Sequence, residues 1–155
     1  MASKHTRLYK ASLHLAAEAR HRYRPWIVCR YAAQDHSLIF TNLVDFDEKF
    51  GHRRNPVGYA KALKEFDDYL PTILDQLKPD DLLMITADHG CDPTFPGSEH
   101  TREYVPVIAY QPGMNNTPLG ERNSFADIGQ TLAQWFNLKA LEYGDGFIDK
   151  LNTVK

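Results

Sequence analysis

Two continuous apolar segments, each followed by side chains that can bind metals, constrain this sequence more than any other feature. The first, residues 37–44, is rich in Leu, Ile, Phe and Val and is followed three residues later by Asp47. The second, residues 82–86, is followed directly by a segment that contains Asp88 and His89. Uninterrupted apolar runs of this length are typical of strands buried on both faces, which occur mostly in parallel sheets. The sequence therefore predicts a sheet with polar chemistry at the ends of its strands.

Helical patterns alternate with these predicted strands. Behind Pro56, residues 57–77 carry apolar side chains at helical spacing, with Pro71 as an expected kink. Residues 105–110 predict a third strand, and residues 125–137 predict a second helix that opens with a capping-box pattern at 124–127. Alternating strands and helices predict an α/β fold with a mostly parallel sheet and flanking helices.

Composition excludes several classes of protein. The chain has 155 residues, a formal net charge of −2 and 43% hydrophobic residues, which favours one folded domain over disorder. No apolar run approaches the roughly 18 residues of a membrane span, and the first residues lack the apolar region of a secretory signal. Cys29 and Cys91 are not in CxxC spacing, which favours a reducing compartment. We expect a cytoplasmic protein that does not cross a membrane.

Residues 1–33 form a basic leader, with seven Lys or Arg residues and one Glu among the first 30. Such a segment fits either a nucleic-acid contact or an ordinary solvated terminus. The leader has no nucleic-acid-binding motif, and its aromatic residues follow no stacking pattern, so we favour the second interpretation and expect no nucleic-acid partner. The sequence indicates no oligomeric state.

The segments that follow the two apolar runs supply carboxylate and imidazole groups. Such groups bind divalent cations such as Mn²⁺, Zn²⁺ and Mg²⁺. The candidate metal ligands are Asp47, His52, Asp88, His89 and His100.

Each of these residues also has a purely structural interpretation. Asp47 fits the cap of a turn, His52 fits a surface loop, and Asp88 fits the cap of the next element. The convergence of acidic and imidazole groups from three separate exits of strands into loops favours the metal site. Arg53 and Arg54 fit a phosphate, a carboxylate or a solvated face equally well.

Five segments together resemble phosphopentomutase, a bacterial enzyme family of the alkaline-phosphatase superfamily that is close to the cofactor-independent phosphoglycerate mutases. The resemblance extends over about residues 34–148 and keeps the order of the motifs. The Asp-His-Gly motif alone indicates only the superfamily, whereas the Asp-Phe-Asp and His-Thr-Arg-Glu motifs favour phosphopentomutase. The segments are 40–47, 51–54, 86–94, 100–106 and 125–131.

The resemblance implies a function and a set of ligands. Family members hold two Mn²⁺ ions and move a phosphate between the C1 and C5 oxygens of ribose or deoxyribose. Asp47, His52 and His100 resemble the ligands of one ion, and Asp88 and His89 resemble two ligands of the other. The implied substrate is a pentose phosphate.

The chain also departs from the family. It has no counterpart of the early metal-binding Asp, the nucleophilic Thr or the cap domain, so residues 34–155 resemble the C-terminal part of a family member. We expect a partial alkaline-phosphatase-like core without a catalytic nucleophile, which retains one Mn²⁺ and is inactive alone. Two alternatives remain: another superfamily phosphatase or phosphoglycerate-type mutase, and a non-catalytic remnant or binding module.

Overall fold

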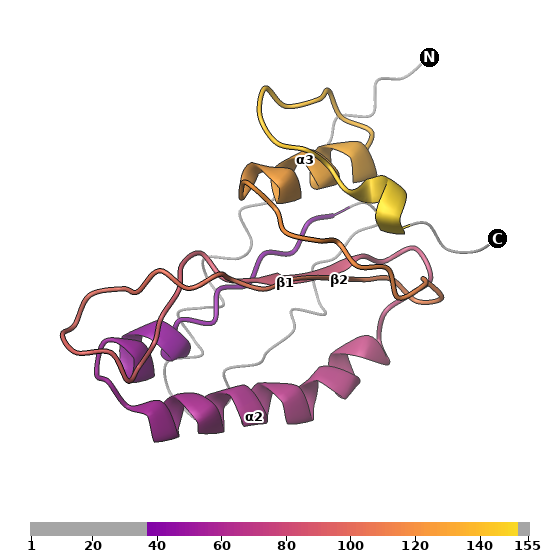
Figure 1. Cartoon of the computed structure of the whole chain (residues 1–155). Helices are drawn as coiled ribbons and strands as arrows, with labels where there is room; N and C mark the ends of the chain where they lie inside the picture. The colour runs from indigo at the N-terminus through magenta and orange to yellow at the C-terminus, as the bar shows by residue number, and fades with distance from the viewer. Residues whose placement is uncertain (1–36, 152–155) are drawn as a thin grey trace, which may run out of the picture. The chain divides into compact units, whose positions relative to one another are not determined.

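A computed structural model describes residues 37–151 of the chain (Figure 1). The leader predicted for residues 1–33 lies outside the described residues. Within them the chain divides into two compact units. The first unit consists of residues 37–73 and 91–102, and the second consists of residues 74–90 and 103–151.

The first unit contains two consecutive helices. A six-residue π-helix, η2, spans Phe46–Gly51, and a 19-residue α-helix, α2, spans Pro56–Leu74 and ends in the second unit. The side chain of Asn55 caps α2, because its Oδ1 accepts a hydrogen bond of 2.9 Å from the Gly58 N–H. The predicted helix is thus confirmed, although it ends three residues before the predicted end at residue 77.

The apolar side chains of α2 are buried to different degrees. Ala62 is its buried residue, whereas Leu63 is 50% exposed. Pro71 lies inside the helix, which continues beyond it. None of the helices within residues 37–151 is long and apolar enough to cross a lipid bilayer.

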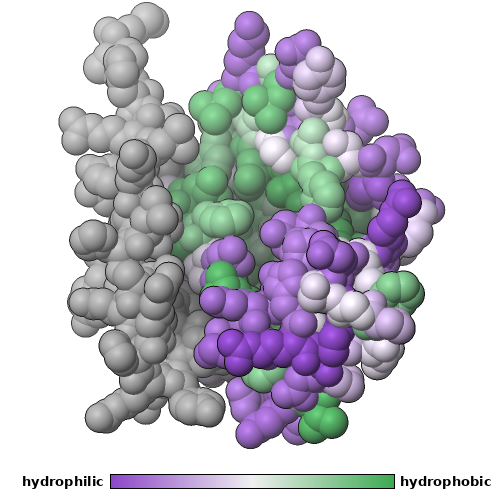
Figure 2. Space-filling view, turned by 90° about the vertical axis from the view of Figure 1, so that its left-hand side faces the viewer, coloured by the Kyte–Doolittle hydropathy of each residue, from purple (hydrophilic) through white to green (hydrophobic). Residues whose placement is uncertain are grey.

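The prediction of a strand over residues 37–44 is wrong. Residues 37–43 have no regular secondary structure, and Phe40 is 72% exposed. Large apolar side chains are found at the surface of the described part of the chain, as Figure 2 shows. A strand exists only where a neighbouring strand satisfies its N–H and C=O groups, and residues 37–151 provide none for this segment.

The sheet lies in the second unit and is antiparallel, which corrects the predicted mostly parallel sheet. Strand β1 spans Leu83–Thr86 and strand β2 spans Val107–Tyr110, with Leu83 opposite Tyr110 and Thr86 opposite Val107. A parallel pair requires a crossover connection, usually a helix, and the linking residues 87–106 contain none. The described residues are therefore α/β in content but contain only a two-stranded antiparallel sheet.

The core of the second unit forms around helix α3, which spans Ala126–Trp135, and the short 3₁₀-helix η3, which spans Ile148–Leu151 (Figure 1). Asp127 on α3 is 4% exposed and forms a 2.8 Å ion pair with Arg122. Its other carboxylate oxygen accepts a 2.8 Å hydrogen bond from the Asp145 N–H. Only half of the predicted capping box forms: Ser124 Oγ accepts from the Ala126 N–H at 3.1 Å, but the Asp127 carboxylate binds Arg122 and the Asp145 N–H.

Thr131 connects α3 to the segment before η3. Its side chain is fully buried, and its hydroxyl donates to the Asp127 carbonyl at 2.7 Å and accepts from the Phe147 N–H at 2.9 Å. We expect Thr131→Val to lower the free energy of unfolding by about 1–3 kcal/mol, because the buried Phe147 N–H loses its acceptor. Denaturant unfolding measures this loss.

The matched control is Thr117→Val, which makes the same chemical change at an exposed position. We expect this control to change stability by less than about 0.5 kcal/mol. Equal effects of the two substitutions would contradict the role assigned to the Thr131 hydroxyl.

Candidate metal centre

The geometry of η2 brings Asp47 and His52 together although they are five residues apart. In a π-helix the main-chain hydrogen bonds join residues i and i+5, and the His52 N–H donates to the Asp47 carbonyl at 2.9 Å. The two side chains therefore leave neighbouring turns on one side, and His52 Nε2 lies 3.3 Å from Asp47 Oδ2. Asp45, which precedes η2, forms a 2.7 Å ion pair with Lys49 and takes no part in this cluster.

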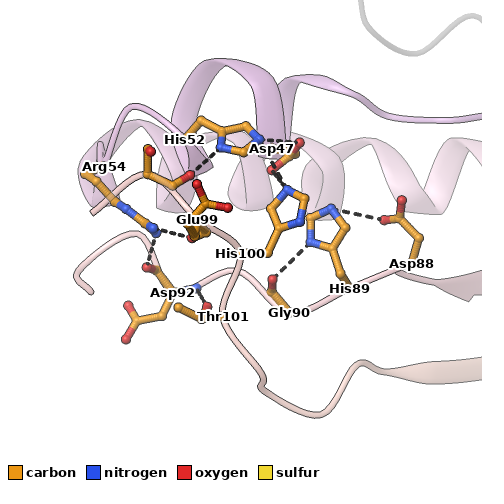
Figure 3. Close-up of polar contacts among 11 residues, drawn as sticks. Asp47, His52, Arg54, Asp88, His89, Gly90, Asp92, Glu99, His100 and Thr101 are labelled. Carbon is orange, nitrogen blue, oxygen red and sulfur yellow. Dashed lines mark hydrogen bonds and ion pairs between the residues drawn. The ribbon is translucent and has the colours of Figure 1, made fainter. Parts of the chain in front are cut away.

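His100 reaches the same carboxylate from the distant segment 91–102. Its Nε2 lies 3.5 Å from Asp47 Oδ1 and 3.2 Å from His52 Nε2. Figure 3 shows the two imidazole rings turned toward the carboxylate. Their centroids are 4.8 Å apart with an interplanar angle of 40°. Within the first unit, the structure thus brings the predicted ligands Asp47, His52 and His100 together.

The helix η2 and the 91–102 segment approach each other closely at Gly51. A Cβ at this position would lie 2.6 Å from Cys91 Sγ and 3.3 Å from Asp47 Oδ1. Separations below about 3.0 Å do not occur for real Cβ atoms, so the contact requires glycine. Gly51 therefore allows the start of the 91–102 segment to pack directly on η2.

The Ser98 carbonyl determines which nitrogen of His52 carries the proton. It lies 2.6 Å from His52 Nδ1, and a carbonyl oxygen only accepts hydrogen bonds, so Nδ1 must be the donor. In the neutral ring, Nε2 then presents its lone pair to Asp47 and His100. Metal-binding histidines show this arrangement, in which the second ring nitrogen donates to a carbonyl or carboxylate.

The donor atoms of this cluster fit a divalent cation. Asp47 Oδ1 is buried and accepts no hydrogen bond from the residues that the structure describes, although His100 Nε2 is 3.5 Å away. The separations of 3.2–3.5 Å between donors equal those expected between ligands that bind one ion at about 2.1 Å. The side chains of His52 and His100 are 43% and 46% exposed, which leaves room for further ligands.

Asp88 and His89 belong to the second unit and follow β1 closely. His89 Nε2 lies 3.7 Å from Asp88 Oδ1, and His89 Nδ1 lies 3.0 Å from the Gly90 carbonyl. A carbonyl oxygen only accepts hydrogen bonds, so this contact favours a proton on Nδ1 in this histidine also. The Asp88 side chain is 86% exposed. The assignment of these two residues to a second ion stays a prediction.

Sequence reasoning missed the groups that hold the ligands in place. The Ser98 and Gly90 carbonyls are main-chain atoms, which every residue carries, so the sequence contains no signal for them. Arg54 was expected at a phosphate, a carboxylate or a solvated face. Its guanidinium instead donates to main-chain carbonyls of the 91–102 segment.

Comparisons with known proteins agree with the resemblance noted in the sequence. The family model described as the Metalloenzyme superfamily matches residues 27–140. The chain is 90% identical over 124 residues to the phosphopentomutase of Pseudoalteromonas translucida, covering 80% of this chain and 31% of that protein. Identities are 57% over 117 residues to the phosphopentomutase of Shewanella sp. strain MR-7 and 54% over 119 residues to that of Colwellia psychrerythraea. These matches cover 76% and 77% of this chain, which spans 29% and 30% of those relatives.

The tautomers assigned to His52 and His89 can be measured directly. In metal-free protein at mildly alkaline pH, ¹⁵N-correlated NMR spectra of the imidazoles should show protonated Nδ1 and unprotonated Nε2 for both rings. A predominantly Nε2–H ring at His52 would contradict the role of the Ser98 carbonyl.

Proposed function

Because the chain belongs to the Metalloenzyme superfamily, we propose that its Asp47, His52 and His100 bind a divalent cation that serves phosphopentomutase-type phosphoryl transfer. The proposed reaction moves a phosphate between the C1 and C5 oxygens of ribose or deoxyribose, and the proposed ion is Mn²⁺. The observation that carries this proposal is the cluster itself, in which one carboxylate and two imidazole nitrogens lie 3.2–3.5 Å apart.

The chemistry of the donors supports a metal of intermediate hardness. Two imidazole nitrogens and a carboxylate suit Mn²⁺ or Zn²⁺ better than Ca²⁺, which prefers oxygen ligands only. The names of the relatives support a pentose phosphate as the substrate and a mutase over a simple phosphatase. The superfamily match alone does not distinguish these reactions.

The residues of this chain have distinct parts in the proposal. Asp47 supplies negative charge on two oxygens, and His52 and His100 each supply a neutral nitrogen donor. A bound divalent cation would supply positive charge that stabilises phosphoryl oxygens. Asp88 and His89 would provide two ligands to a second such ion. Two protein ligands are fewer than the three of typical catalytic sites, so the second site would bind weakly in this chain alone.

We assign no residue of this chain as the nucleophile. The chain spans about 30% of the length of the relatives that it matches. The proposal therefore gives residues 34–155 the role of a C-terminal metal-binding part and gives the leader, residues 1–33, no role in the reaction. It also places the protein in the cytoplasm, where thiols such as Cys91 stay reduced.

Metal binding tests the ligand assignment. We expect the purified chain to bind about one Mn²⁺, and His52→Ala to weaken binding by at least about 100-fold, because a ligand is lost. Isothermal titration calorimetry and the EPR signal of free Mn²⁺ measure both values. The control His5→Ala removes a histidine that has no Asp or Glu within ten residues in the sequence, and this variant should bind like wild type. Equal binding by all three proteins would show that His52 is not a ligand.

Activity assays test the absence of a nucleophile. We expect the chain with Mn²⁺ to convert neither ribose 5-phosphate nor 3-phosphoglycerate, because covalent phosphoryl transfer needs an attacking group and the proposal assigns none to this chain. Phosphorus NMR of the reaction mixture detects either product. Formation of ribose 1-phosphate would contradict this expectation, and turnover of 3-phosphoglycerate would favour a phosphoglycerate-type mutase.

A further inference from the structure

We propose that Arg54 is a positioning residue for the metal centre, which holds residues 92–99 so that His100 and the Ser98 carbonyl stay in place. This inference rests on the proposed metal-binding function of Asp47, His52 and His100. In this proposal Arg54 supports the metal ligands and does not contact a substrate phosphate.

The guanidinium of Arg54 binds three main-chain carbonyls of one loop. Its Nη1 donates to the Asp92 carbonyl at 2.8 Å, its Nε donates to the Gly97 carbonyl, and its Nη2 donates to the Glu99 carbonyl. Figure 3 shows the side chain directed at the loop. A planar guanidinium has its donors in a fixed fork, so it holds several acceptors at once, which a lysine ammonium does not do with the same geometry.

The positions of these carbonyls explain the effect on the ligands. The Ser98 carbonyl binds His52 Nδ1, and Ser98 lies between Gly97 and Glu99 in the sequence. The carbonyls of Gly97 and Glu99 accept hydrogen bonds from the Nε and Nη2 atoms of Arg54. Glu99, which accepts from Nη2, directly precedes His100. Arg54 therefore fixes the main chain on both sides of Ser98 and immediately before His100.

The backbone of Arg54 has an unusual conformation that supports this arrangement. Its φ is +50°, in the left-handed region that is unfavourable for residues with a Cβ. The Arg54 N–H donates to the Gly51 carbonyl at 3.0 Å, which closes the turn after η2. Such conformations persist where surrounding contacts enforce them, and they occur often at functional sites. Here the turn directs the side chain toward the loop.

The loop has further contacts of its own. The Asp92 N–H donates to Thr101 Oγ1 at 2.6 Å, which joins the two ends of the loop. The hydroxyl and N–H of Thr94 both donate to the Asp92 carboxylate, which holds the pKa of Asp92 below its usual value. These bonds shape the loop locally, whereas the Arg54 contacts attach it to the turn that carries His52.

The chain offers a matched control for a test. Arg53 is the adjacent residue and its side chain is exposed. We expect Arg54→Met to weaken Mn²⁺ binding by about 10–100-fold, as loss of a group that supports metal ligands does elsewhere. Arg54→Lys should also weaken binding, because one ammonium does not hold all three carbonyls. Arg53→Met should bind Mn²⁺ like wild type, and unchanged affinity in Arg54→Met would overturn the proposal.

A second measurement separates this proposal from the metal assignment. In metal-free Arg54→Met, the NMR signal of the His52 Nδ1 proton should broaden or shift as its contact with the Ser98 carbonyl loosens, while Arg53→Met leaves it unchanged. If wild type itself binds no Mn²⁺, the metal assignment fails and this signal alone decides the role of Arg54. If circular dichroism shows that Arg54→Met does not fold, Arg54→Lys decides, and a wild-type signal and affinity in that variant overturn the proposal.

Discussion

The close approach of three electron-rich groups is the main constraint on the structure of the first unit. The Asp47 carboxylate and the Nε2 atoms of His52 and His100 lie within 3.5 Å of one another. With the Ser98 carbonyl occupying the Nδ1–H of His52, neutral His52 directs a lone pair toward Asp47 and His100. Lone pairs and a carboxylate at this distance repel each other unless a proton or a cation lies between them. The surrounding chain must therefore hold these groups together, and a cation would convert their repulsion into attraction.

Two kinds of structure supply that restraint. The π-turn of η2 holds Asp47 and His52 through the main chain, which needs no particular side chain beyond the glycine at position 51. His100 comes from a long loop, and loops hold a fixed path only where enough contacts outweigh their conformational entropy. Arg54 suits that task because a single side chain satisfies three carbonyls that would otherwise turn to water.

The sequence predicted which side chains lie together in the first unit better than it predicted the sheet. Carboxylates and imidazoles carry their metal chemistry wherever they lie, so the five candidate ligands could be named from the residues alone. The resemblance to phosphopentomutase then implied that Asp47, His52 and His100 form one set. Helix α2 was also predictable, because its Asn55 cap and apolar spacing are local signals. The sheet was not, since a strand depends on partners elsewhere in the chain. Residues 37–43 have the composition of a buried strand, yet nothing in residues 37–151 pairs with them.

The same main-chain device orients a histidine in each unit. The Ser98 carbonyl binds His52 Nδ1 in the first unit, and the Gly90 carbonyl lies at His89 Nδ1 in the second. Each of these carbonyls belongs to the same unit as the imidazole ring that it contacts. The direction of each Nε2 lone pair is therefore set within its own unit, before any arrangement between the units matters. Under the proposed function, binding a metal would require little reorientation of these two nitrogens, which would lower the entropic cost of binding.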